Sequence, residues 1–85
     1  MRPFYSRDFK KQFQKLPKKI QNCFRERLEI FLNNKFHPLL NNHRVEKRFP
    51  GCRSINVTGN YRAIFKETSD DSITFILIGT HSELY

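Results

Sequence analysis

The chain is poor in the residues that define several classes of small protein. Its 85 residues include two cysteines, three glycines, four prolines and no tryptophan. Two isolated cysteines, Cys23 and Cys52, can build neither a disulfide framework nor a zinc site. No apolar stretch approaches the length of a transmembrane helix, and residues 1–5 lack the apolar run of a signal peptide. We therefore expect a cytoplasmic protein with reduced thiols and no membrane partner.

Acidic residues are also scarce relative to basic ones. The chain has 16 Lys and Arg residues against 8 Asp and Glu residues, which gives a net charge of +8. A field of this sign attracts polyanions, so nucleic acid or an acidic protein is the expected partner. The length fits one domain, spanning residues 1–85, with one modest hydrophobic core.

The first half of the chain predicts a short strand at residues 2–5 and then two amphipathic helices. Ser6 fits a helix N-cap, and Phe9, Phe13 and Leu16 follow it at helical spacing. Pro17 fits the first turn of the second helix, which ends at residues 33–34. The apolar stripe of that helix has spacings of three and four residues and consists of Ile20, Cys23, Phe24, Leu28, Phe31 and Leu32.

The second half of the chain predicts four strands. Residues 45–49 form a charged candidate for an edge strand, and residues 53–58 alternate, with Ile55 and Val57 on one side. A hairpin signal at residues 59–60 leads to a strand at 61–66, and residues 73–78 are apolar enough for a central strand. The expected fold class is α+β, a helical hairpin packed on a small antiparallel sheet in the order β-α-α-β-β-β-β.

The three histidines suggest no metal site, but one of them stands in a favourable place for catalysis. His37, His43 and His81 are dispersed, and no carboxylate cluster accompanies them, so we expect neither a metal nor a cofactor. His81 follows the end of the last strand and precedes the final tyrosine, Tyr85, by four residues. A strand end is a rigid mount, and imidazole suits proton transfer near neutral pH.

Basic and aromatic residues are interleaved along the predicted strands. Cations can hold a phosphate backbone while aromatic rings stack on bases. Arg62 lies within an otherwise apolar strand, where it is either a solvent-facing residue or a guanidinium aimed at phosphate. If a histidine and an arginine converge without metal, they could cleave RNA through attack of the ribose 2′-hydroxyl. The interleaved residues are Lys47, Arg48, Phe49, Arg53, Tyr61, Lys66 and Tyr85.

Two segments carry a resemblance to a known family. They are the stretch from His43 to Phe65, with Pro50-Gly51-Cys52-Arg53-Ser54-Ile55 and Asn60-Tyr61-Arg62-Ala63-Ile64-Phe65, and the tail Gly79-Thr80-His81-Ser82-Glu83-Leu84-Tyr85. The chain resembles the RelE/ParE superfamily of bacterial type II toxin–antitoxin toxins, and it is most similar to the YafQ-type mRNA interferases. This resemblance implies an endoribonuclease that cuts mRNA on the ribosome, in the A site of the small subunit. It also implies a cognate acidic antitoxin as partner.

The resemblance further implies roles for individual residues. His81 matches the catalytic histidine of the terminal motif, a general acid, and Tyr85 matches its terminal aromatic residue. His43 is implied as the base, and Arg62 matches an arginine that holds the scissile phosphate. The implied substrate-binding residues are Lys47, Arg48, Arg53, Tyr61, Asn56 and Asn60.

The chain also departs from the YafQ-type pattern. Asn56 stands where that pattern has a histidine, Asn60 where it has an aspartate and Tyr61 where it has a tryptophan. Leu77 stands where the pattern has an arginine.

Two other functions fit the same sequence features. A ParE-like inhibitor of DNA gyrase on the same scaffold would need no histidine. A non-catalytic nucleic-acid-binding module would need only the positive charge. The presence of His43 and His81 argues against the gyrase inhibitor, and salt-sensitive binding without any cleavage of mRNA would favour the binding module.

Overall fold

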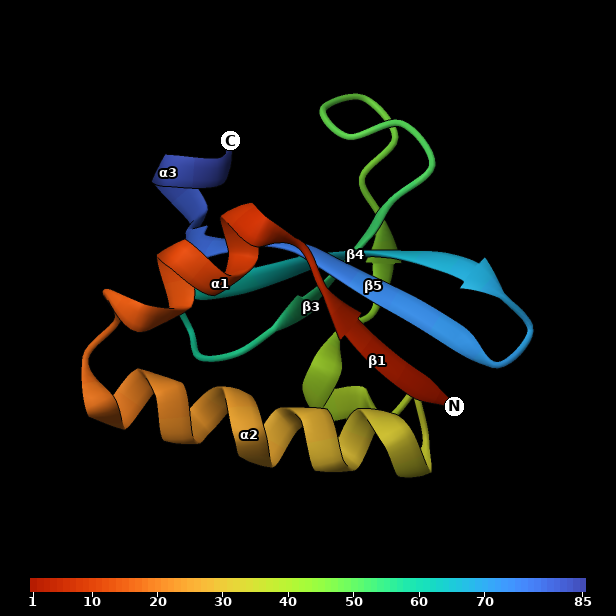
Figure 1. Ribbon diagram of the computed structural model, residues 1–85, viewed down its shortest axis with the longest axis horizontal. Helices are drawn as coiled ribbons and strands as arrows, with labels where there is room; N and C mark the ends of the chain where they lie inside the picture. Colours follow the sequence, from red (N-terminus) through yellow and green to blue (C-terminus); the bar gives the residue numbers. More distant parts are fainter.

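A five-stranded sheet, covered by helices, forms the frame of the computed structural model, which describes residues 1–85 (Figure 1). The strand order is β1-β5-β4-β3-β2. The elements in chain order are β1 (Arg2–Tyr5), α1 (Arg7–Gln14), α2 (Lys18–Asn33), the 3-10 helix η1 (Pro38–Leu40), β2 (His43–Arg44), β3 (Arg53–Asn56), β4 (Tyr61–Ser69), β5 (Ser72–Thr80) and α3 (His81–Leu84).

The sheet is mixed, whereas the sequence predicted an antiparallel one. β2, β3, β4 and β5 pair antiparallel, but β1 pairs parallel to β5, with Tyr5 opposite Phe75. This pairing places β5 between β1 and β4, which confirms the prediction of an interior strand at residues 73–78. The α+β class, with a helical pair on a small sheet, is also confirmed.

The predicted edge strand at residues 45–49 is wrong. The edge strand is the shorter β2, and residues 45–50 form a loop in which the Phe49 N–H donates to the Val45 carbonyl at 2.8 Å. Pro50 has no N–H for a strand ladder, and Gly51 turns the chain with φ 78°. This 45–50 loop keeps its charged residues exposed while Val45 and Phe49 are partly buried.

The two N-terminal helices begin where the sequence predicted. The Ser6 hydroxyl accepts from the Phe9 N–H at 3.0 Å and donates to the Ile76 carbonyl at 2.6 Å, so it caps α1 and ties the helix to β5. Pro17 occupies the N-cap position of α2, which ends at Asn33.

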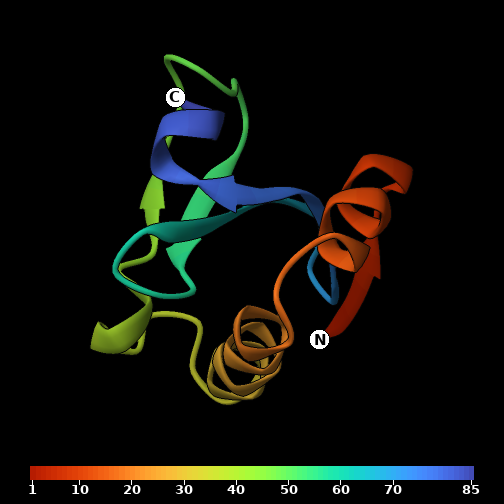
Figure 2. The same ribbon diagram turned by 90° about the vertical axis from the view of Figure 1, so that its left-hand side faces the viewer.

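The main core lies between the sheet and the helices α1 and α2, which cover one of its faces (Figure 2). The centre of this core is aromatic. The ring of Phe75 on β5 has five aromatic neighbours, with centroid distances between 5.2 and 5.9 Å. These contacts come from both helices and from two neighbouring strands, so Phe75 links the layers. The neighbours are Tyr5, Phe9, Phe24, Phe31 and Phe65.

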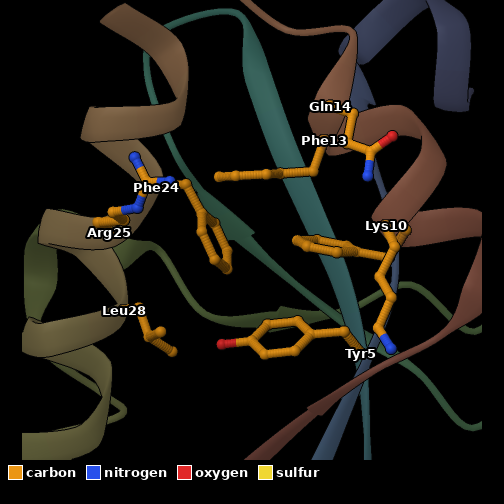
Figure 3. A pocket seen from close by; sticks show the side chains of 8 residues that line it. Tyr5, Lys10, Phe13, Gln14, Phe24, Arg25 and Leu28 are labelled. Atoms are coloured by element: carbon orange, nitrogen blue, oxygen red, sulfur yellow. The ribbon is translucent and has the colours of Figure 1, made fainter. Parts of the chain in front are cut away.

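A pocket of about 410 Å³ opens beside this core, between α1 and α2 (Figure 3). Its walls are mainly aromatic, and Lys10 and Arg25 stand at its sides. The side chain of Tyr5 extends across the pocket towards Leu28, and burial raises the pKa of its hydroxyl. None of the helices has the length and apolar character needed to cross a membrane.

A second, smaller cluster covers the other face of the sheet. It consists of Cys52, Ile64 and Leu84, with the partly buried Val45, Phe49, Ile76 and Leu77 packed against it. Its members come from the 45–50 loop, the strands and α3. This cluster therefore brings the C-terminal residues against the loop, and both views show the C-terminus close to it (Figures 1 and 2).

Candidate active site

The position of His81 is fixed by backbone contacts on both sides of it. Its N–H donates to the Asn60 carbonyl at 2.9 Å, which ties the start of α3 to the hairpin between β3 and β4. Thr80 is the N-cap of α3: its hydroxyl accepts from the Glu83 N–H, while the Glu83 carboxylate accepts from the Thr80 N–H at 2.8 Å.

Gly79 lets α3 fold back onto the sheet. A Cβ atom at this position would lie 3.2 Å from Oε1 of Glu83 and 3.6 Å from Cδ2 of Leu84. A side chain here would displace the Glu83 carboxylate of the capping box by a few tenths of an ångström, so glycine favours this close approach. The glycine therefore permits the turn that brings the tail over this face.

The imidazole of His81 lies beside the last aromatic ring. The centroids of the His81 and Tyr85 rings are 4.7 Å apart, and Tyr85 also meets Phe49 edge-on at 6.1 Å. Arg48 adds a hydrogen bond from Nε to the Leu84 carbonyl at 3.3 Å. His81 remains exposed, so its ring is both oriented by its neighbours and open to a ligand.

A groove of about 390 Å³ lies between Tyr85 and the 45–50 loop. Three cations and one carboxylate line it, so the groove favours an anion. Lys47 and Arg48 are exposed there, and Arg48 is the one that also holds the tail. The lining residues are Arg44, Val45, Glu46, Lys47, Arg48 and Tyr85.

Arg62 lies on the face of the sheet that carries the second cluster, and part of its guanidinium group is hydrogen-bonded to the backbone. In the sheet register, Arg62 on β4 lies opposite Asn56 of β3 on one side and opposite Gly79 of β5 on the other. Its Nη1 donates to the carbonyls of Thr58 at 2.8 Å and Tyr61 at 3.0 Å. The other guanidinium N–H groups have no acceptor within the protein, so Arg62 can still offer donors to a phosphate.

Two buried oxygens on this face have no hydrogen-bond partner. They are Oγ of Ser54, whose side chain is fully buried, and Oδ1 of Asn56. Buried polar atoms are usually paired, so these two are exceptions, but neither is accessible to a ligand. Asn56 was predicted as a substrate-binding residue, whereas the only pattern that involves Ser54 is its alternation with Ile55.

Some of the predicted site residues lie away from His81 and the groove. Tyr61 packs against the main core on the helix side, and Asn60 contributes to the site through its carbonyl. Arg53 pairs with Phe65 and therefore points to the helix side as well. His43 is exposed opposite Ser54, on the same face as Arg62 but in no contact with His81.

The capping box of α3 should respond to pH. Hydrogen bonds from the Thr80 N–H and the Thr80 hydroxyl hold the pKa of Glu83 below its ordinary value. A lowered pKa means that the carboxylate stabilises α3 above its ordinary pKa and that this contribution disappears as pH falls through the lowered one. We expect the Thr80 amide to lose protection from hydrogen exchange as pH falls through that lowered pKa, as measured by NMR. A Glu83→Gln variant should lack this transition, and an identical transition in the variant would refute the assignment.

Comparison with known proteins places the chain in a family of this architecture. The sequence matches the family described as ParE toxin of type II toxin-antitoxin system, parDE, over residues 4–85. A comparison with curated proteins gave no match.

Solved structures share the fold at low sequence identity. YafQ from E. coli strain BL21(DE3) is 22% identical with a TM-score of 0.81, covering 99% of this chain and 97% of that one. A YoeB/ParE toxin from Agrobacterium tumefaciens is 12% identical with a TM-score of 0.79, covering 95% and 99%. A chain of the RelB-RelE antitoxin-toxin complex from Methanococcus jannaschii is 19% identical with a TM-score of 0.73, covering 96% and 94%.

The family match and the shared fold agree with each other. The match extends over nearly the whole chain, from β1 to the terminal tyrosine. The predicted resemblance to the RelE/ParE superfamily is therefore confirmed, with a fold close to that of YafQ. The chain belongs to the ParE toxin family and is a toxin of a type II toxin–antitoxin system.

Proposed function

We propose that this toxin is a ribosome-dependent, metal-independent endoribonuclease that cuts mRNA in the A site and thereby inhibits translation. A cytoplasmic location follows from that substrate. The observation that carries the proposal is the exposed imidazole of His81, held 4.7 Å from the ring of Tyr85 beside a basic groove. A proton donor, an aromatic ring and cations are the groups that RNA cleavage without a metal requires.

The proposed reaction uses the substrate's own nucleophile. The ribose 2′-oxygen attacks the adjacent phosphorus and loses its proton to a base, while the bond from phosphorus to the 5′-oxygen breaks. Protonated His81 gives its proton to that leaving oxygen, which leaves a 2′,3′-cyclic phosphate and a 5′-hydroxyl end. The free N–H groups of Arg62 and the cations Lys47 and Arg48 would stabilise the charge on the phosphorane.

His43 is the proposed base, on the opposite side of the scissile phosphate from His81. Because it pairs with Ser54, its side chain belongs to the same face of the sheet as Arg62. Catalytic contacts often tighten only when substrate is bound, so the separation between the two histidines leaves room for the nucleotide. Asn56, which is partly exposed and pairs with Arg62 on the neighbouring strand, would contact the RNA between them.

The proposed protein partner is a cognate acidic antitoxin. The net charge of +8 favours an acidic protein, and relatives of this fold were solved as complexes, among them a DinJ-YafQ complex from E. coli and a YoeB-YefM complex from Staphylococcus aureus. The aromatic pocket between α1 and α2, flanked by Lys10 and Arg25, offers an apolar surface with positive charge at its sides (Figure 3).

Inhibition of DNA gyrase is the second candidate, because the matched family is named for ParE. The two functions separate cleanly in a supercoiling assay with purified gyrase, where a nuclease specific for mRNA has no effect. A binding module without catalysis would be inert in this assay and would cut no mRNA.

Primer extension on cellular mRNA after induction of the toxin tests the proposal. We expect new 5′ ends within translated regions, and we expect them to disappear when translation initiation is blocked. Intact mRNA together with inhibited supercoiling would contradict the nuclease and favour the gyrase inhibitor.

A further inference from the structure

Phe36 is the most exposed aromatic side chain of the protein, and two cations flank it. Its exposed fraction is 59%, although phenylalanine is usually buried. Nζ of Lys35 lies 5.5 Å from the ring centroid and Cζ of Arg53 lies 5.6 Å from it. The ring stands in the turn after α2 and belongs to neither hydrophobic cluster. The exposed ring therefore offers an aromatic face directly beside two positive charges.

A chain of polar contacts holds these cations in place. Nε of Arg53 donates to Oδ1 of Asn42 at 2.7 Å, and Nδ2 of Asn42 donates to the Lys35 carbonyl at 2.9 Å. Nζ of Lys35 lies 2.9 Å from Oε1 of Glu67. A group ordered before binding loses less entropy on association, so this arrangement favours a ligand.

The sheet adds a second guanidinium beside the first. Arg44 on β2 pairs directly with Arg53 on β3, and like charges in this position destabilise a strand pair. Glu46 and Glu67 line the adjoining hollow, but Glu46 accepts from the Gly51 N–H and Glu67 pairs with Lys35. Neither arginine has an ion-pair partner in the protein, so an external anion would relieve their repulsion.

This surface meets the groove beside His81 at Arg44, which lines both, whereas Phe36 and Arg53 do not line that groove. Arg53 pairs with Phe65, whose ring is in the main core, so Arg53 points to the helix side of the sheet. The site of His81 lies on the other side, and β5 runs five residues from Phe75, the partner of Phe65, to Thr80. At about 3.3 Å per residue, Arg53 and His81 are roughly 15 to 20 Å apart.

We propose that Phe36 and Arg53, together with Arg44 at the boundary of the groove, form a second RNA-binding surface for unpaired nucleotides that extends beyond the cleavage site. The Phe36 ring offers a face on which a base stacks, and the two guanidinium groups bind phosphates next to it. The choice of RNA as the polyanion rests on the proposed function, but the contact itself requires no cleavage. This surface would anchor RNA on the helix side while the scissile phosphate reaches His81 on the other.

Fluorescence anisotropy with a labelled, unstructured oligouridine tests this surface without ribosomes. A Phe36→Leu variant, which stays apolar but loses the ring, should bind about tenfold more weakly than the wild type. Phe4→Leu is the matched control, because Phe4 is 48% exposed with Cζ of Arg2 5.8 Å from its ring, and its affinity should not change. An Arg44→Gln variant should bind less tightly and show a shallower dependence on salt, but Arg44 also lines the groove beside Tyr85, so Phe36→Leu is the variant that tests this surface by itself.

Unchanged affinity in Phe36→Leu, or an equal loss in Phe4→Leu, would overturn the proposal. If Phe36→Leu keeps its affinity for RNA but no longer binds an acidic protein partner, the surface is a protein-binding one and the proposal is overturned. Melting temperatures of all variants should match the wild type, because the changed side chains are exposed. The anisotropy assay measures binding alone. A toxin that fails to cut mRNA would therefore refute the proposed nuclease activity but would leave the measured RNA affinities unchanged.

Discussion

Replacing His81 with glutamine is expected to lower the rate of mRNA cleavage by about 10² to 10⁴. Glutamine keeps polarity and similar size, but it cannot give a proton to the leaving 5′-oxygen. The exposed position of His81 makes the change harmless to the core, and the Asn60 carbonyl still accepts from the backbone N–H. The measurement is the rate of cleavage of mRNA bound to purified ribosomes.

A second histidine provides the control for this change. The His37 side chain accepts from the Leu39 N–H at 3.1 Å and caps η1, away from the groove beside Tyr85. His37→Gln should therefore cut mRNA at the wild-type rate. Cleavage by a folded His81→Gln protein at the wild-type rate would show that His81 is no general acid.

Replacing Phe75 with alanine is expected to lower the free energy of unfolding by about 3 to 5 kcal/mol. The side chain is fully buried among five aromatic rings from α1, α2 and two strands, so its loss leaves a cavity where the layers meet. Urea denaturation followed by circular dichroism gives the value. The exposed Phe4, changed to alanine, should cost less than about 0.5 kcal/mol.

A small domain is marginally stable, so the alanine variant could unfold altogether. Phe75→Leu keeps most of the apolar volume and should fall between the alanine variant and the wild type. Equal stability of Phe75→Leu, Phe75→Ala and the wild type would contradict the central place of this ring in the core.

Local sequence patterns predicted the two N-terminal helices. They could not predict which distant segments pair in the sheet, or in which direction. Ser6 and the aromatic spacing after it define α1 within a few residues. The parallel pairing of β1 with β5 joins residues about 70 positions apart, and no local pattern encodes its direction. The error at residues 45–49 has a visible cause, because Pro50 and Gly51 favour a turn over a ladder.

Residue spacing and the alternation of strand faces predict part of the candidate site. His81 and Tyr85 are four residues apart, so a single helical turn brings their rings together. The alternation of strand faces also places Arg53 and Arg62 on opposite sides of the sheet. Arg53 is two residues from Ile55, a core residue, and so shares its face, whereas Arg62 pairs with Asn56 on the other face. The contact of Arg48 with Leu84 and the free Oγ of Ser54 depend on tertiary packing, which no local pattern shows.

Cleavage of a ribosome-bound mRNA that lacks one 2′-hydroxyl is the most direct test of the proposed mechanism. The mRNA would carry a 2′-deoxy nucleotide on the 5′ side of a cut mapped beforehand by primer extension, and an all-ribose mRNA would serve as reference. The proposed mechanism predicts that the reference is cut to give a 2′,3′-cyclic phosphate and that the deoxy substrate stays intact at that bond. Cleavage of both mRNAs at equal rates would contradict attack by the 2′-oxygen and with it the roles assigned to His81 and His43.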